Sequence, residues 1–325
     1  MPGTTEVVNK IKETNALCKD LISEVENTIL GKRNVLEHIM VDILAGGNIL
    51  FEDYPGLAKT LMANTFAKAL GCKFQRIQFT PDLLPSDITG TYVFNPKTNT
   101  FNFHAGPIFT NILLADEINR APPKTQAALL EAMQEKQVTV EGNTHKLPEP
   151  FFVFATQNPI EYEGTYPLPE AQLDRFMMKL SVGYPDFEVE KEIVLRRHKR
   201  SHDDVPVDAV TDTTQVLKMQ QSLEFIHFDE RLIDYLTRVI HLTRSHPMVE
   251  VGSSPRGTLA LYKLARAVAV LSGRHYVLPD DVKLIAISAL KHRIILKPEP
   301  RIRGVKPEDI ISEILMQVPV PSGDE

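Results

Sequence analysis

Residues 48–70 constrain the fold more than any other part of the chain, because a short apolar run leads through a Pro-Gly loop into a helix. The loop, residues 53–60, reads Asp-Tyr-Pro-Gly-Leu-Ala-Lys-Thr and separates an apolar run at 48–51 from a helix predicted over 59–70. A phosphate-binding loop requires this order, since its backbone N–H groups wrap phosphates and the helix N-terminus adds positive potential. We therefore expect Lys59 to reach a bound polyphosphate and the Thr60 hydroxyl to ligate Mg²⁺.

The loop departs from the general pattern G-x-x-x-x-G-K followed by Ser or Thr. That pattern has glycine at both positions where this chain has Asp53 and Ala58. If position 58 needs a positive φ, a Cβ there costs about 1–2 kcal/mol. Taken alone, the segment is also compatible with a Pro-Gly turn before an ordinary helix.

Further short apolar runs alternate with helical patterns along the first half of the chain. The runs are apolar on both faces, as buried parallel strands are. The expected strands cover residues 48–51, 74–79, 112–115, 151–156 and 177–182. Helices with a 3.6-residue period are expected over 7–29 and 34–45. This alternation predicts an α/β fold with a doubly wound, parallel, five-stranded sheet.

Two polar segments interrupt the alternation, and a different pattern follows them. Residues 90–105 and 137–147 each alternate around a turn and are predicted to form β-hairpins. Beyond residue 185 the chain is helical in pattern, apart from a polar linker at about 198–212. The expected helices cover residues 188–197, 217–223, 230–244, 256–271, 279–295 and 307–316. We therefore predict an α/β core over 1–184 and a linker with an all-α lid over 185–325.

Polar side chains follow two of the apolar runs. Asp116 and Glu117 end the run at 112–115, and Asn158 follows the run at 151–156. Open α/β sheets bind ligands at the carboxyl ends of their strands. Asp116 is expected to hold Mg²⁺, Glu117 to polarise the attacking water, and Asn158 to orient that water or touch the γ-phosphate. Acids after a strand can also be helix N-caps, and Asn before Pro is a common loop residue.

Composition narrows the class of protein. A length of 325 residues suggests about two domains. The net charge of −6 argues against nucleic acid as the main partner, because neutralising phosphates drives such binding. Cys18 and Cys72 have no metal-ligand spacing, which fits a reducing compartment. We find neither a signal core nor a long apolar run, so we expect a soluble, cytoplasmic protein without a membrane span.

Arginine is the residue type that suits a transferring phosphoryl group, because its planar guanidinium stabilises the developing charge. The candidates are Arg120, Arg175 and Arg256. Most arginines are solvated surface residues, and spacing alone does not favour these three.

At this point the chain resembles the MoxR family of AAA+ ATPases. The resemblance lies in the runs 106–109, 116–126, 129–135, 155–161 and 163–176. It covers about residues 5–318 and is strongest over 50–180. These runs are long, so the match is specific.

The resemblance implies a role for each candidate residue. Lys59 and Thr60 match Walker A, Asp116 and Glu117 match Walker B, Asn158 matches sensor 1, Arg175 matches an arginine finger acting on the neighbouring subunit's ATP, and Arg256 matches sensor 2 on the lid. The implied nucleotide contacts are Leu30, Gly31, Pro55, Gly56, Leu57, Ala58, Lys59, Thr60 and Leu61. Arg120 is expected to face a subunit interface.

The resemblance further implies an ATP- and Mg²⁺-dependent, hexameric homo-oligomer that remodels client proteins, often proteins with a von Willebrand factor A domain. The two hairpins resemble a helix-2 insert and a pre-sensor-1 hairpin, which implies contact with a client. Three alternatives stay open: a nucleotide-gated binding module with negligible turnover, supported by Ala58; a nucleic-acid motor, which the net charge disfavours; and a metal-insertion motor similar to magnesium chelatase subunits.

Overall fold

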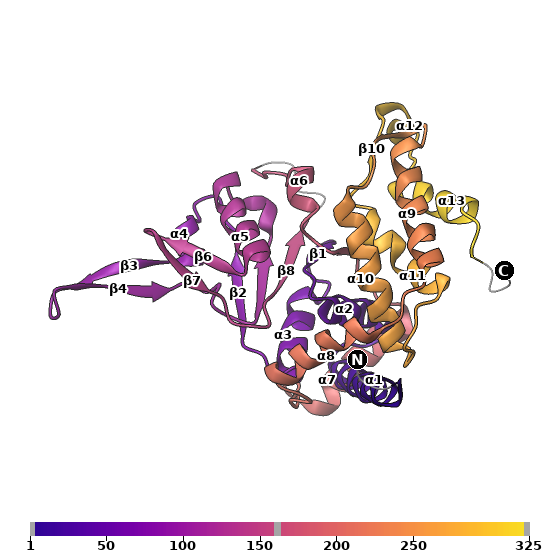
Figure 1. Ribbon diagram of the computed structural model, residues 1–325. Coiled ribbons are helices and arrows are strands. Elements are labelled where there is room, and N and C mark those ends of the chain that lie inside the picture. Colours follow the sequence, from indigo (N-terminus) through magenta and orange to yellow (C-terminus); the bar gives the residue numbers. More distant parts are fainter. Residues whose placement is uncertain (1–3, 159–163, 322–325) are drawn as a thin grey trace.

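The computed structural model describes residues 4–158 and 164–321, and its centre is a five-stranded parallel sheet (Figure 1). The strand order β2-β5-β8-β1-β9 confirms the predicted doubly wound topology. The strands are β1 (Ile49–Glu52), β2 (Phe74–Gln78), β5 (Ile112–Asp116), β8 (Phe152–Gln157) and β9 (Met178–Leu180). In β5 and β8 every residue except the last is buried, which explains their continuous apolar sequence.

Helices cover both faces of the sheet. Alternate residues of β5 divide between two apolar clusters: Ile112 and Leu114 pack with the N-terminal helices, and Leu113 packs on the other face. The first face is covered by α1 (Thr4–Thr28), α2 (Arg33–Ala45) and α3 (Lys59–Ala69), and the second by α4 (Pro85–Thr89) and α5 (Pro123–Glu135). The single-turn helices η1 (Ile118–Arg120) and α6 (Glu170–Leu173) follow β5 and precede β9.

Both predicted hairpins are present. β3 (Gly90–Asn95) pairs with β4 (Thr100–Ala105), and β6 (Gln137–Val140) pairs with β7 (Asn143–Lys146). The side chain of His145 joins the two hairpins, since its ring stacks on Phe103 with centroids 4.0 Å apart and Nε2 lies 3.3 Å from the Tyr92 hydroxyl. Figure 1 shows the β3–β4 hairpin projecting away from the rest of the molecule.

The C-terminal part is mainly helical, as predicted, but two features differ from the prediction. Its elements are α7 (Phe187–Arg200), α8 (Thr213–Ser222), η2 (Leu223–Phe225), α9 (Glu230–Ser245), β10 (Val249–Val251), α10 (Pro255–Leu271), α11 (Pro279–Leu290), β11 (Ile295–Leu296), α12 (Pro298–Ile302) and α13 (Pro307–Gln317). The helix expected over 279–295 ends at Leu290, because the chain then turns so that β11 can pair with β10. The linker is also shorter than expected, since α7 runs to Arg200.

One apolar cluster runs from the sheet into the C-terminal helices. It contains Leu114 of β5, Phe66 of α3 and Leu264 of α10. The predicted boundary at residue 184 lies between β9 and α7, and the division into two domains stays a prediction. Among the described residues, no helix is both long and apolar enough to cross a membrane.

Candidate functional site

The loop between β1 and α3 has the backbone that a phosphate cradle needs. Gly56 has φ +83° and Ala58 has φ +57°, so position 58 does need a positive φ. The Cβ of Ala58 therefore costs about 1–2 kcal/mol relative to glycine. Lys59 follows, and its Nζ donates to the carbonyl oxygens of Asp53 and Tyr54, both at 2.9 Å. Desolvation lowers the pKa of Lys59, and nearby carboxylates oppose that shift.

Asp53, the other departure from the general loop pattern, has a structural role. Its buried carboxylate accepts hydrogen bonds from the Ser181 hydroxyl at 2.8 Å and from the backbone N–H groups of Val182 and, at 3.4 Å, Gly183. These bonds tie the start of the loop to the segment that follows β9. A glycine at position 53 would leave the N–H groups without these partners.

A cavity of about 450 Å³ lies between this loop and the ends of β5 and β8. Its lining comprises Asp53, Pro55, Gly56, Leu57, Ala58, Lys59, Thr60, Leu61, Arg76, Asp116, Glu117, Thr156, Gln157 and Asn158. The structure therefore brings together the predicted loop, both acids and Asn158. The Thr60 hydroxyl and the Asp116 carboxylate are oxygen ligands of the kind that Mg²⁺ prefers, so the residues fit a Mg²⁺-polyphosphate. We refer to this cavity as the phosphate pocket.

The two acids are held by β8. The Thr156 hydroxyl donates to Asp116 Oδ1 at 2.6 Å and accepts from the backbone N–H of Glu117 at 2.8 Å. Glu117 itself has φ +55°, a left-handed conformation that is rare for this residue type. Strained backbone of this kind is typical of functional sites.

Two polar residues of β2 also contact the acids, and the sequence analysis did not identify them. Arg76 Nη2 lies 2.6 Å from Asp116 Oδ2, and Gln78 Nε2 donates to Glu117 Oε2 at 2.7 Å. Arg120 Nε lies 3.2 Å from the same Glu117 oxygen. The only signal in the sequence is that residues 76 and 78 are polar at a spacing of two, which places both side chains on one face of a strand.

A second cavity, of about 270 Å³, adjoins the phosphate pocket. The two share Gly56, Leu57, Ala58 and Leu61. The other lining residues are Thr28, Ile29, Leu30, Lys32, Met62, Val182, Gly183, Pro185 and Ile193, most of them apolar. Leu30, an expected nucleotide contact, therefore lines a largely apolar cavity beside the phosphate pocket. Gly31 has φ +67° and packs against Val189, so a Cβ there would meet Val189 Cγ2 at 2.6 Å.

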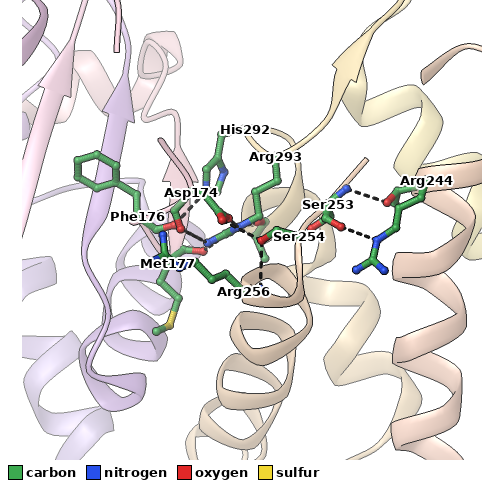
Figure 2. Close-up of polar contacts among 11 residues, drawn as sticks. Asp174, Phe176, Met177, Arg244, Ser253, Ser254, Arg256, His292 and Arg293 are labelled. Atoms are coloured by element: carbon green, nitrogen blue, oxygen red, sulfur yellow. Dashed lines mark hydrogen bonds and ion pairs between the residues drawn. The ribbon is translucent and has the colours of Figure 1, made fainter. Parts of the chain in front are cut away.

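Arg175 and Arg256 lie together, but in a different cavity. This cavity, also about 270 Å³, is lined by Met133, Gln134, Asp174, Arg175, Met177, Arg256, Leu259, Ala260, Lys263 and Arg293, none of which lines the phosphate pocket. We call it the arginine pocket. Arg256 Nη2 donates to Gln134 Oε1 at 3.3 Å, whereas the buried Nε of Arg175 has no hydrogen-bond partner among the described residues. Figure 2 shows Arg256 at the start of α10, facing the segment after Asp174.

Residues 159–161 and 163 of the resembling runs 155–161 and 163–176 lie outside the described residues. Among the remaining residues of these runs, Asn158 lines the phosphate pocket, and Asp174 and Arg175 line the arginine pocket. Among the described residues, no cluster of His, Cys, Asp and Glu could hold a metal ion by itself. A metal at Asp116 would take the Thr60 hydroxyl and phosphate oxygens as further ligands.

Comparisons with known proteins agree with this geometry. Residues 48–178 match the family described as ATPase family associated with various cellular activities (AAA), and residues 241–314 match the AAA lid domain. A crystal structure of a protein from Cytophaga hutchinsonii, assigned as an ATPase, superposes with a TM-score of 0.90 at 41% identity. That superposition covers 97% of this chain and 98% of the other. The fold is thus an α/β P-loop AAA+ core with a helical lid.

Curated relatives narrow the family. The uncharacterized protein YeaC of Bacillus subtilis is 46% identical over 95% of this chain and 97% of its own length. The chaperone MoxR1 of Mycobacterium tuberculosis is 43% identical over 92% of this chain and 81% of its own length. The chain therefore belongs to the MoxR family of AAA+ ATPases.

Proposed function

We propose that this chain hydrolyses ATP in a hexameric homo-oligomer whose active sites lie between subunits. Lys59 and the N-terminus of α3 bind the phosphates. Thr60 and Asp116 hold Mg²⁺, which supplies charge neutralisation on the phosphate oxygens when it is bound. Glu117 polarises the attacking water and Asn158 orients it.

The observation that carries this proposal is the separation of the two pockets. Arg175 and Arg256 line no part of the phosphate pocket of their own chain. Phosphoryl transfer gains greatly from an arginine that stabilises the transition state, and such an arginine can come from a second molecule. We therefore assign both arginines to the phosphate pocket of a neighbouring subunit. Arg120 pairs with Glu117 in its own chain, and its role at an interface is part of the same proposal.

Mixing two inactive variants tests this arrangement. Glu117→Gln removes the water-polarising acid but keeps the arginines, whereas Arg175→Ala keeps the acid but lacks one arginine. Each variant alone should bind ATP and turn it over poorly. Mixed assemblies should regain turnover, because the arginine of one variant meets the intact phosphate pocket of the other.

The control is a mixture of Glu117→Gln with Lys59→Ala, in which no phosphate pocket is intact and no turnover should return. For the unmodified chain, specific activity should rise with protein concentration. Turnover that is independent of concentration, together with no recovery on mixing, would show that Arg175 acts within its own chain.

The alternative of nucleotide binding without turnover depended on Ala58. Its φ of +57° is the conformation for which glycine is favoured in a phosphate loop, so the loop keeps its shape despite the Cβ. Lys59, Thr60 and both acids line the same cavity. We therefore retain hydrolysis as the proposal.

We further propose that the hydrolysis remodels client proteins, including proteins with a von Willebrand factor A domain. The support is the β3–β4 hairpin, which projects from the molecule and leaves Val93, Phe94 and Phe101 exposed. Exposed apolar side chains at such a tip suit contact with a protein. A client of this class should stimulate turnover, and Phe101→Ser should lower that stimulation without changing the turnover of the chain alone.

We assign this activity to the cytoplasm. Cys18 and Cys72 are both free and buried, and burial raises the pKa of each thiol to about 12. Free structural thiols fit a reducing compartment.

A further inference from the structure

The loop that carries Arg175 is bound to the lid by one buried arginine. Arg293 follows α11, and only 3% of its side chain is exposed. Its Nε donates to Asp174 Oδ1 at 2.7 Å, Nη1 donates to the carbonyl oxygens of Met177 at 3.1 Å and Ala289, and Nη2 to those of Asp174 at 3.2 Å and Phe176 at 2.7 Å. Every N–H of the guanidinium thus has an acceptor, which is the condition under which a buried arginine is tolerated.

The second oxygen of the same carboxylate reaches the helix that carries Arg256. The Ser254 hydroxyl donates to Asp174 Oδ2 at 2.8 Å. Ser254 is also the N-cap of α10, because its hydroxyl oxygen accepts from the backbone N–H of Arg256 at 3.1 Å. Figure 2 shows Asp174 between Arg293 and Ser254. One carboxylate therefore joins the residue before Arg175 to the first turn of the helix that presents Arg256.

The neighbouring residues fix this junction to the rest of the lid. The Ser253 carbonyl accepts from Arg244 Nε at 2.8 Å, and its N–H donates to the Thr243 hydroxyl at 3.0 Å, both on α9. His292 is buried, and its Nε2 lies 3.0 Å from the Phe176 carbonyl oxygen. Loss of the Ser254 hydroxyl would thus release one of several connections rather than unfold the lid.

We infer that Asp174 is a positioning residue: by accepting from Ser254 and Arg293 it holds Arg175 and Arg256 as one unit, so that both reach a neighbour's phosphate pocket in a fixed relative geometry. This inference rests on the proposed function. It assigns no contact with ATP to Asp174, Ser254 or Arg293. It predicts that loosening the junction lowers turnover at the neighbouring site and leaves the nucleotide affinity of the chain's own pocket unchanged.

Ser254→Ala is the most informative variant, because it removes the bond to Asp174 without leaving a buried charge. Loss of an N-cap costs about 1 kcal/mol and should lower Tm by only about 1–3 °C in a chain of this size, so the protein should fold. Misplacing the two arginines should lower kcat roughly 10- to 100-fold. The Kd for a fluorescent ADP should not change, and Ser254→Thr, which keeps the hydroxyl, should restore kcat.

Asp212→Ala is the matched control. Asp212 is the N-cap of α8, where its carboxylate accepts from the Gln215 N–H at 2.9 Å, and it lines neither pocket. It should lower Tm by a similar amount and leave kcat unchanged. Equal kcat losses in Asp212→Ala and Ser254→Ala would mean that the effect comes from stability, which would overturn the inference.

The mixing experiment separates the inference from the proposed function. Mixing Glu117→Gln with Arg175→Ala should restore turnover. Mixing Arg175→Ala with a double variant that carries both Glu117→Gln and Ser254→Ala should not, because the only intact Arg175 is then misplaced. If the first mixture regains turnover and the second regains as much, only the positioning role is overturned. If neither mixture regains turnover and the unmodified chain hydrolyses no ATP at any concentration, the proposed function is overturned and the inference falls with it.

Discussion

Replacing Ala58 by glycine should stabilise this protein, although glycine usually destabilises a chain. The native φ of +57° costs alanine about 1–2 kcal/mol relative to glycine. Glycine in turn makes the unfolded state more flexible, which costs about 0.4–1 kcal/mol. The difference predicts that Ala58→Gly raises the free energy of unfolding by about 0.5–1 kcal/mol. Urea unfolding of the nucleotide-free protein at fixed, low concentration measures it.

An exposed helical alanine provides the matched control. Ala127 lies within α5, where the same change to glycine should lower the free energy of unfolding by about 1 kcal/mol. The unfolded-state effect is shared, so the two variants should differ by roughly 1.5–2 kcal/mol through their native backbones alone. The affinity for ADP should stay within about threefold of the parent, since the loop already has its phosphate-binding shape. Equal destabilisation by Ala58→Gly and Ala127→Gly would refute the argument from φ.

Three further predictions concern other parts of the molecule. Burial raises the pKa of Asp42 well above its ordinary value, so the folded state keeps a proton that the unfolded state releases near pH 4. Stability should fall by about 1.4 kcal/mol per pH unit from there up to the folded pKa, and denaturation at several pH values should show that Asp42→Asn removes this slope. Gly31→Ala should lower Tm, because a left-handed φ and a contact with Val189 both oppose a Cβ. Adding Val189→Ala should recover the part of the Tm loss that comes from this contact. An unchanged Tm in Gly31→Ala would contradict the packing. Arg76→Gln should tighten Mn²⁺ binding in the absence of nucleotide severalfold, since it removes a cation 2.6 Å from Asp116; weaker binding in a titration would contradict this.

The elements that could be predicted from the sequence are those whose residues signal their own surroundings. β5 and β8 are apolar throughout because both faces of a central parallel strand are buried, and each ends in polar residues where the sheet edge begins. The alternation in β6 reflects its two faces, since Val138 is buried and the next residue, Thr139, is exposed. The order of strand, loop and acid therefore predicted residues that the structure brings together around one cavity, namely Lys59, Thr60, Asp116 and Glu117.

Contacts between segments far apart in the chain leave no local pattern in the sequence from which they could be predicted. Arg76 and Gln78 meet Asp116 and Glu117 only because β2 is paired in register with β5, and no local pattern encodes that pairing. The end of α11 was misplaced for a similar reason. Residues 291–295 continue the apolar period of the helix, yet the pairing of β11 with β10 outweighs it. The arginine pocket is likewise built from α5, the segment before β9 and α10, which are far apart in the sequence.

The phosphate pocket and the arginine pocket differ in how their charged side chains are paired, and this difference affects how subunits would associate. In the phosphate pocket, Asp116 is paired with Arg76, and Glu117 with Gln78 and Arg120, all from the same chain. In the arginine pocket, the buried Nε of Arg175 has no hydrogen-bond partner among the described residues. A buried donor without an acceptor is costly, so an anion supplied by a second subunit would stabilise this side of the molecule more than the other. Nucleotide bound to one subunit should therefore strengthen its contact with the next. In sedimentation velocity, ATP should shift the slowly hydrolysing Glu117→Gln variant towards larger assemblies. Adding Arg175→Ala to that variant should abolish the shift.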